Sequence, residues 1–296
     1  MYLKILLQNK YIYKIGSSAI LIINLIKNIL NIYDDNMYKL MEANMKLQVL
    51  VSCMHQQDYS LLEKMNIQTD AIIINQCDIN KFEDIKYRNN LVKFISLNER
   101  GVGKSRNNAL LRADSDICLF ADEYEDIIIK AFKKNPDADI ILFNLESTNK
   151  QRPIYQITKE KRVRKYNFLK YGTVRIAAKV SSLRKANVHF SLLFGGGTKY
   201  GSGEDSLFLK DCISRGLKIY ASPKKIGYVS QDSSCWFEGY NEKYFHDKGA
   251  LYYCISNKYS KLLCLQFLLR KRKKVCENID IIRAYKLMVS GIKDFK

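Results

Sequence analysis

Proline, glycine and histidine are scarce in this chain, and each scarcity excludes a class of protein. The 296 residues include 3 prolines and 14 glycines, which excludes collagen-like and proline-rich chains. The 3 histidines lie neither near one another nor at ligand spacing from a cysteine, which argues against a structural zinc site. The 8 cysteines form no CxxC pair and several lie within apolar runs, so we expect reduced thiols in the cytoplasm.

Acidic residues are also few relative to basic ones. The 30 Asp and Glu residues face 49 Lys and Arg residues, which gives a net charge of +19. A surface of this charge favours anionic partners, namely phosphates, nucleic acid or acidic lipid. Hydrophobic residues make up 47% of the chain, enough for a buried core, so a mainly disordered protein is excluded.

The first 44 residues form an amphipathic extension. Its most apolar part, residues 19–33, carries Asn and Lys residues at helical spacing. A helix of that length spans roughly 22 Å, short of the roughly 30 Å hydrocarbon core, which argues against a membrane-spanning helix. No small-residue cleavage site follows, so we expect no removable signal peptide. Two interpretations stay open, an interfacial helix lying on a membrane and a helix packed on the body of the protein.

From residue 45 onward, short β-rich runs alternate with helical stretches. The predicted strands are 46–53, 71–75, 91–97, 117–121, 140–144 and 217–221. The predicted helices are 60–65, 105–113, 126–134 and 206–215. This alternation predicts an α/β fold with a mainly parallel sheet flanked by helices. Ligands of such sheets bind at the carboxyl ends of the strands, so the residues that follow each strand are the candidate site.

A glycine-containing turn, residues 101–110 (GVGKSRNNAL), follows the third predicted strand and opens a helix. It is not a P-loop, because that motif requires glycine at the position of Asn98. The turn still places Lys104 and Arg106 near a helix N-terminus, which suits a bound diphosphate. An ordinary solvated helix start is the alternative interpretation.

Two acidic clusters carry the candidate chemistry. The first, residues 122–126, follows the strand at 117–121, and hard cations such as Mg²⁺ or Mn²⁺ prefer oxygen ligands, so Asp122 and Glu123 are candidate metal ligands. Glu125 and Asp126 are better explained as the acidic first turn of the next helix, where they stabilise its dipole.

The second cluster, Glu204 and Asp205, follows a glycine-rich stretch, residues 195–203. Glycines let the backbone lie against a substrate, and a carboxylate at a helix start can accept the proton of an attacking hydroxyl. The alternative is that Glu204 or Asp205 simply caps a helix that begins at Ser206.

Taken in order, five motifs resemble the bacterial family 2 glycosyltransferases of the GT-A fold, especially members that synthesise polysaccharides. The motifs are VLVSCM, AIIINQCD, RGVGKSRNNAL, a strand followed by ADE, and GGGTKYGSGEDSLF. The resemblance covers about residues 45–250. It implies a GT-A-like, Rossmann-type sheet with helical N- and C-terminal extensions. The chain is then divided into an extension (1–44), a glycosyltransferase domain (45–255) and a basic helical tail (256–296).

The resemblance implies transfer of a sugar, with inversion, from a nucleotide-sugar donor to an acceptor hydroxyl. Asp205 falls on the catalytic base, with Glu204 beside it. Asp122 and Glu123 fall on the element that binds the ribose and a Mn²⁺ or Mg²⁺ ion. Tyr124 stands where the family often has a third acidic residue, which puts metal binding in doubt.

The remaining candidate site residues follow strands or lie in the glycine-rich and aromatic stretches. The expected donor contacts are Cys53, His55, Asp78, Arg106 and Asp122. The expected acceptor contacts are Gly196, Gly197 and Trp236.

Two basic segments suggest where the acceptor is found. Residues 152–175 carry eight Lys and Arg against one acid, and residues 258–296 carry eleven against three. Each basic residue near an anionic membrane is worth about 1 kcal/mol, so these segments favour a lipid-linked glycan acceptor, as in the synthesis of capsule, O-antigen or another cell-surface polysaccharide. We therefore expect a cytoplasmic protein bound peripherally to the inner face of the plasma membrane. Solvated helix faces would give the same pattern.

Two alternative functions stay open. A nucleic-acid-binding protein is compatible with the net charge, but no recognisable binding motif accompanies it, so nucleic acid is not an expected partner. A non-catalytic glycosyltransferase relative is suggested by Tyr124.

Overall fold

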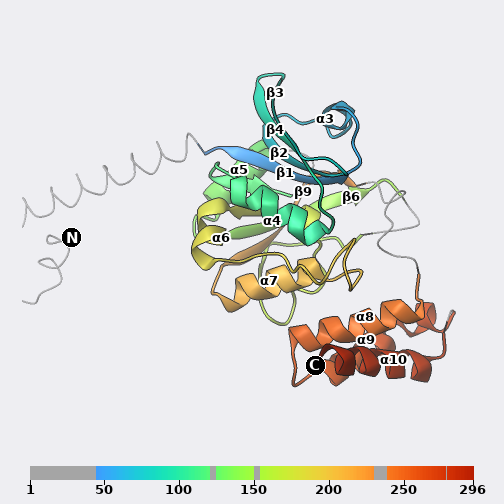
Figure 1. Ribbon diagram of the computed structural model, residues 1–296. Helices are drawn as coiled ribbons and strands as arrows, with labels where there is room; N and C mark the ends of the chain where they lie inside the picture. Colours follow the sequence, from blue (N-terminus) through green and yellow to red (C-terminus); the bar gives the residue numbers. More distant parts are fainter. Residues whose placement is uncertain (1–44, 121–124, 150–153, 230–238, 278) are drawn as a thin grey trace, which may run out of the picture. The chain divides into compact units, whose positions relative to one another are not determined.

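The computed structural model describes residues 45–120, 125–149, 154–229, 239–277 and 279–296 (Figure 1). All described helices and strands belong to one unit, Lys46–Lys296. The expectations for the extension at 1–44, for Asp122, Glu123 and Trp236 fall outside the described residues, and they stay predictions.

A nine-stranded sheet in the order β3-β4-β2-β1-β5-β8-β6-β9-β7 forms the centre of this unit. The strands are β1 (Leu47–Met54), β2 (Asp70–Gln76), β3 (Lys81–Tyr87), β4 (Asn90–Leu97), β5 (Ile117–Leu119), β6 (Ile140–Ser147), β7 (Lys161–Val163), β8 (Ile176–Lys179) and β9 (Ile219–Val229). The neighbours β4, β2, β1 and β5 are parallel, as are β6 and β9, whereas β3, β7 and β8 run antiparallel to their neighbours. The predicted mainly parallel α/β sheet is thus confirmed.

The strand sequences explain these positions. In β2 every residue after Asp70 is buried, which is the continuous apolar pattern of a strand covered on both faces. The edge strand β3 (KFEDIKY) has four charged residues and no buried one. Charges of this kind protect a sheet edge from pairing with another chain, and they also hid β3 from a search for apolar runs.

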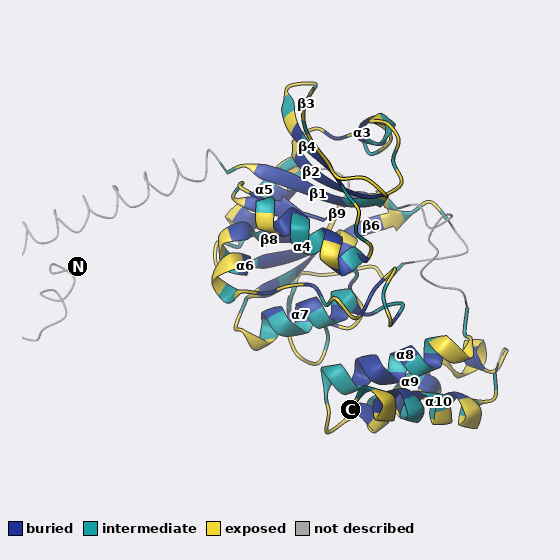
Figure 2. Ribbon diagram, in the orientation of Figure 1, coloured by how far each residue is buried: buried dark blue, intermediate teal, exposed yellow. Residues whose placement is uncertain are grey.

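The described chain also contains helices, some of which pack beside this sheet. The helices are α3 (Ser60–Lys64), α4 (Val102–Arg112), α5 (Glu125–Lys134), α6 (Val180–Ala186), α7 (Glu204–Ser214), α8 (Glu242–Ile255), α9 (Ser260–Val275) and α10 (Ile281–Phe295). Helix α4 contacts β1 and β2, α6 contacts β8, and α5 contacts β9. Figure 2 shows the central strands buried beside these helices. The main core joins them through residues such as Leu50, Ile72 and Phe208.

Helices α8, α9 and α10 pack on one another around a core of their own, which includes Phe245, Leu268 and Met288. A Cβ added at Gly249 of α8 or at Gly291 of α10 would lie 1.9 Å from a carbonyl oxygen of the facing helix. The two helices can therefore approach closely only because both positions are glycine. The predicted boundary at 255/256 separates α8 from the two helices that it packs against, and that division of the chain stays a prediction.

One basic residue is placed differently from the expectation. The basic composition of residues 152–175 predicts a surface loop or helix, but Arg175 is only 4% exposed. Its guanidinium donates hydrogen bonds to the carbonyl oxygens of Phe143 (3.1 Å) and Tyr155 (2.6 Å), and burial lowers its pKa. The expectation is wrong for Arg175, because the backbone carbonyls of the strand β6 and of residue 155 satisfy its charge inside the fold.

The structure also bears on two further expectations, that the cysteines are reduced thiols and that no helix spans a membrane. The seven cysteines of the described part are all free thiols, and Cys235 lies outside it. Within the described ranges, no helix combines the length and the apolar character needed to span a bilayer.

Candidate active site

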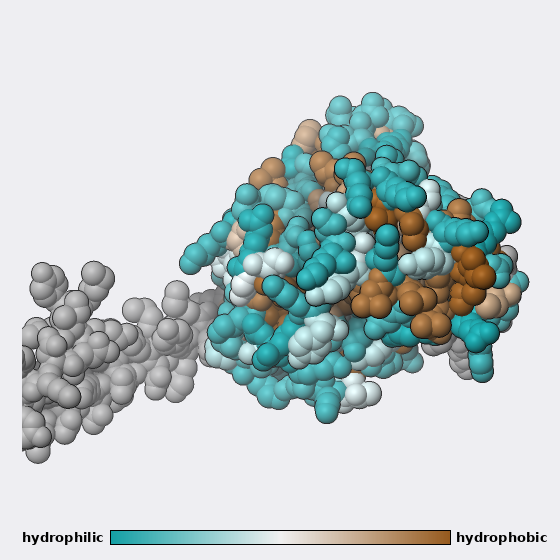
Figure 3. All heavy atoms as spheres, turned by 90° about the horizontal axis from the view of Figure 1, so that it is seen from below, coloured by the Kyte–Doolittle hydropathy of each residue, from teal (hydrophilic) through white to brown (hydrophobic). Residues whose placement is uncertain are grey.

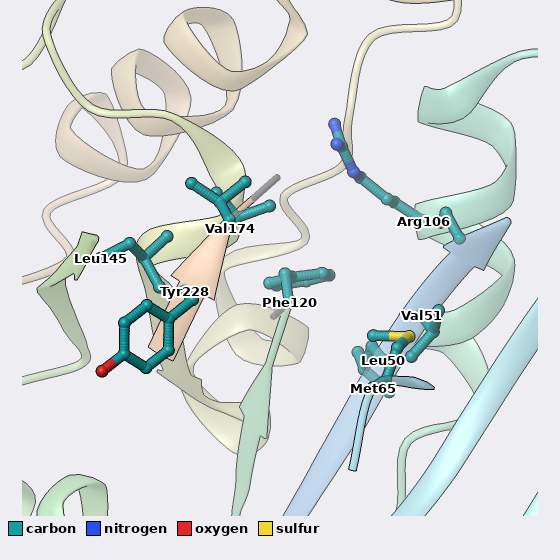
Figure 4. A pocket seen from close by; sticks show the side chains of 10 residues that line it. Leu50, Val51, Met65, Arg106, Phe120, Leu145, Val174 and Tyr228 are labelled. Atoms are coloured by element: carbon teal, nitrogen blue, oxygen red, sulfur yellow. The ribbon is translucent and has the colours of Figure 1, made fainter. Parts of the chain in front are cut away.

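A cavity of about 170 Å³ lies at the carboxyl ends of the parallel strands, where the sequence predicts the site (Figure 4). Its walls are formed by Leu50, Val51, Ser52, Met65, Arg106, Phe120, Leu145, Val174, Tyr228 and Val229. Figure 4 shows Arg106 reaching from α4 on one side, with Val174 and Tyr228 across the cavity. Phe120 directly precedes the segment 121–124, so the predicted metal element follows a cavity-lining residue in the chain.

Arg106 is held in the cavity wall by an ion pair and by an aromatic ring. Its Nη1 lies 2.8 Å from Oε1 of Glu204, and the two side chains are 16% and 13% exposed. The guanidinium carbon also lies 5.3 Å from the ring centre of Phe190, which stacks on Phe208 at 4.1 Å. These contacts fix a positive charge at the cavity, where an anionic group would bind.

Asp205 lies in the first turn of α7, one residue after Glu204. The helix begins at Glu204 with Gly203 as its N-cap, two residues before the predicted start at Ser206, so neither acid is the N-cap residue. Asp205 Oδ1 accepts a hydrogen bond from the Ser206 N–H at 2.6 Å. Burial and then the charge of Glu204 raise the pKa of Asp205 to about 6, against the opposing effects of the Ser206 hydrogen bond and nearby positive charges. A carboxylate of this pKa is a stronger base than an ordinary aspartate.

A segment before β8 connects Asp205 with the cavity. Asp205 Oδ2 lies 3.6 Å from where a Cβ on Gly172 would be, and Val174, two residues later, lines the cavity. Between them, the Thr173 hydroxyl is buried with no hydrogen-bond partner among the residues that the structure describes. Sequence reasoning missed this segment, because residues 171–174 sit within a basic stretch that was interpreted as surface.

The glycine-rich stretch, residues 195–203, packs against the side chain of Glu204. Gly195 has a φ of 112°, and a Cβ there would lie 2.6 Å from Val102 Cγ1 and 3.1 Å from the Glu204 carboxylate. The N–H of Val102, at the start of α4, donates to the carbonyl oxygen of Gly196 at 3.0 Å. The stretch thus packs against α4 and α7 together, and only glycine leaves room for Glu204 beside Arg106.

The substitution Gly195→Ala should therefore damage the site, whereas Gly196→Ala should not. At Gly195 the methyl group meets Val102 and Glu204 in a backbone conformation that alanine adopts poorly, but at Gly196 nothing lies within 4 Å. We expect Gly195→Ala to lower the free energy of unfolding by about 1–3 kcal/mol and Gly196→Ala to change it by less than about 0.5 kcal/mol. Urea unfolding measures both, and equal effects would contradict the packing described above.

The predicted donor contacts Cys53, His55 and Asp78 lie at the same edge of the sheet but do not line the cavity. Cys53 follows the cavity-lining Ser52, and its thiol donates to the carbonyl oxygen of Ile74 (3.7 Å); burial raises its pKa to about 12, so it stays protonated. His55 is exposed and follows β1 with a φ of 52°. Asp78 is 80% exposed and pairs with Arg100. Their roles in donor binding stay predictions, as do the acceptor roles of the exposed Gly196 and Gly197.

Helix α8 supplies two further residues that sequence reasoning missed. The side chain of Asp247 accepts a hydrogen bond from the Gly201 N–H (2.9 Å), which ties the glycine-rich stretch to α8. The Lys248 ammonium lies within 5.8 Å of the ring centres of Tyr244, Tyr252 and Phe267. Burial lowers the pKa of Lys248, and the charge of Asp205 opposes that shift. The sequence shows only an aromatic run here, so no local signal marks either residue.

The described part of the chain contains no group of three or more His, Cys, Asp or Glu residues that could hold a metal ion. Glu125 and Asp126 lie in the first turn of α5. This is the position that their interpretation as residues that stabilise the helix dipole requires. Burial raises the pKa of Glu125, and the charges of Asp126 and Asp70 add to the effect. Metal binding by Asp122 and Glu123 therefore stays a prediction.

Two crystal structures of S. aureus TarS are among the solved structures that are similar to this chain. The crystal structure of S. aureus TarS 1-349 in complex with UDP-GlcNAc has a TM-score of 0.59 and 17% identity, over 85% of this chain and 80% of that one. A crystal structure of S. aureus TarS 1-349 has a TM-score of 0.51 and 16% identity, over 84% and 92%. No protein-family model and no curated protein sequence matches the chain. At these identities the likeness shows the fold, which is GT-A-like.

Proposed function

We propose that this protein is a glycosyltransferase that moves a sugar from a nucleotide-sugar donor to an acceptor hydroxyl, with inversion. The observation that carries the proposal is the first turn of α7, where Asp205 has a raised pKa and Glu204 holds Arg106 at the cavity. The cavity lies at the carboxyl ends of the strands, where α/β sheets bind ligands. A similar fold in a protein crystallised with UDP-GlcNAc supports a nucleotide-sugar donor.

In the proposed reaction, the Asp205 carboxylate removes the proton of the acceptor hydroxyl. The acceptor oxygen then attacks the anomeric carbon of the donor sugar, while the bond from that carbon to the diphosphate oxygen breaks. The direct displacement inverts the anomeric carbon and needs no covalent enzyme intermediate. Arg106 lies at the cavity wall, where its charge can stabilise the departing nucleoside diphosphate.

A divalent cation is part of the proposal. Asp122 and Glu123 would hold Mn²⁺ or Mg²⁺, which would offset the charge of the leaving diphosphate. Residues 121–124 lie outside the described chain, so no step above depends on the cation.

For the acceptor, we propose a lipid-linked glycan used in the synthesis of a cell-surface polysaccharide. This part of the proposal is supported by the net charge of +19 and by the basic segment 258–296. Both favour a peripheral position at an anionic membrane, on the inner face of the plasma membrane.

Incubation with a panel of UDP- and GDP-sugars tests the proposed function. We expect one donor to raise the melting temperature and to release its nucleoside diphosphate slowly by hydrolysis, with a higher rate in Mn²⁺ than in a chelator. Product release is measured with a coupled nucleotide assay, and heat-inactivated protein is the control. If no donor binds or turns over, and DNA or RNA is instead retained in a salt-sensitive way, the nucleic-acid-binding alternative is correct.

A further inference from the structure

Helix α9 presents a row of leucines to solvent. Leu262, Leu265 and Leu269, here called the leucine face, are 62%, 45% and 60% exposed. Their spacing of three and four residues places them on one side of the helix. The opposite side is already used, because Cys264 and Leu268 are buried in the core shared with α8 and α10. The helix is therefore apolar on two sides, and only one side is covered by the described chain.

Positive charge borders the leucine face, and negative charge is absent from it. Lys261 precedes Leu265 by four residues, and Arg272 and Lys273 follow Leu269 by three and four, so these side chains lie along the same side of α9. Lys258 lies just before the helix begins at Ser260. The sequence has no Asp or Glu between Asp247 and Glu277. A partner must therefore offer an apolar layer together with negative charge.

A space-filling view shows where hydrophobic residues gather on one side of the molecule (Figure 3). Figure 3 shows the molecule from below Figure 1, the side on which α8, α9 and α10 are drawn. Hydrophobic residues, in brown, gather on this face among hydrophilic ones. Exposed apolar residues that gather on one face and are rimmed by polar ones are typical of an interaction surface.

Charge selects one occupant among three. A second copy of the chain would bring the same basic border against itself, which like charges oppose. The extension at 1–44 carries five lysines against three acidic residues, so its net charge is also positive and does not complement the basic border. An anionic phospholipid bilayer offers both an acyl layer for the leucines and phosphates for the lysines and arginines.

We propose that the leucine face of α9 docks on an anionic phospholipid bilayer, with the leucines at the headgroup–acyl boundary and the flanking basic side chains on lipid phosphates. This inference deepens the membrane location that rests on the proposed function. The helices that carry the face also reach the candidate active site, since α8 supplies Asp247 to Gly201 and Lys248 near Asp205. Docking through α9 brings the site to the bilayer that would carry a lipid-linked acceptor.

Vesicle sedimentation of the full-length protein tests the proposal. The vesicles contain equal parts of phosphatidylglycerol and phosphatidylcholine, and vesicles of phosphatidylcholine alone report the contribution of charge. We expect the triple substitution Leu262→Gln, Leu265→Gln and Leu269→Gln to weaken binding to the anionic vesicles about tenfold or more. The double substitution Arg272→Gln and Lys273→Gln should weaken it about fivefold, with a smaller dependence on salt.

Exposed leucines elsewhere provide the matched control. Leu91 and Leu111 are 45% and 73% exposed and lie on β4 and α4, so Leu91→Gln with Leu111→Gln should leave vesicle binding unchanged. Unchanged binding of the leucine-face variant would overturn the proposal, as would equal loss in the control. A wild-type dimer in sedimentation velocity that the leucine-face substitutions dissociate, without vesicle binding, would assign the face to a second copy instead.

The two proposals fail in distinguishable ways. Donor hydrolysis by the leucine-face variant in solution, without vesicles, should match that of the wild type, because α9 contributes no residue to the cavity. Vesicle binding without turnover of any donor would leave the docking proposal standing and contradict the proposed function. Turnover of a donor without vesicle binding would support the proposed function and contradict the docking proposal.

Discussion

Replacement of Asp205 by Asn is expected to lower kcat by about 10²- to 10⁴-fold, the usual contribution of a general base. Asn keeps the size of the side chain but cannot accept the proton of the acceptor hydroxyl. Donor binding should be largely retained, because the cavity wall contains Arg106 and not Asp205. Steady-state transfer and donor-induced thermal shift measure the two effects separately, and full transfer activity in the Asn variant would refute Asp205 as the base.

The pH dependence of transfer gives an independent test of the same residue. Because the pKa of Asp205 is raised to about 6, its carboxylate is mostly protonated below that pH and mostly ionised above it. The rate should therefore rise about tenfold per pH unit below pH 6 and level off above it. Glu204→Gln removes the neighbouring negative charge that raises this pKa, so the rising limb should move to lower pH. If the pH range over which the rate rises does not change in this variant, the group that titrates is not Asp205.

The second large effect is expected at the Arg106–Glu204 ion pair. Arg106→Gln leaves the Glu204 carboxylate, 13% exposed, without its partner, and should lower the free energy of unfolding by about 2–4 kcal/mol. It should also weaken donor binding, because the cavity loses its positive charge. The double variant Arg106→Gln with Glu204→Gln should recover part of the stability but none of the donor binding, since no unpaired charge remains buried.

A surface ion pair provides the matched comparison for stability. Lys134 and Glu160 lie 2.9 Å apart and are 66% and 44% exposed, so Lys134→Gln should cost less than about 1 kcal/mol. Urea unfolding measures each variant, and thermal shift with the donor measures binding. Equal losses at the two pairs would show that the Arg106–Glu204 pair is not held in a low-dielectric environment.

The parts of the fold that sequence patterns predicted are those with strong local signals. The apolar runs of β1, β2 and β6 and the helix starts after residues 101 and 203 lie within a few residues of their predicted places. The strands β3, β7 and β8 were missed. β3 is highly charged, β7 has three residues, and β8 (IAAK) is buried by its neighbours β5 and β6 rather than by any hydrophobic pattern of its own.

The features of the candidate site also fall into those that local sequence patterns predicted and those that only the folded structure revealed. The amino-acid sequence alone determined that the chain has an α/β sheet and that acidic and glycine-rich motifs follow its strands, because side-chain periodicity and turn residues act over a few positions. Only the tertiary structure decided that Glu204 pairs with Arg106 across 98 positions, that Gly172 adjoins Asp205, and that the described residues leave the second apolar side of α9 exposed. Such contacts depend on how distant elements pack, and local periodicity does not encode which side chains the folded chain brings together.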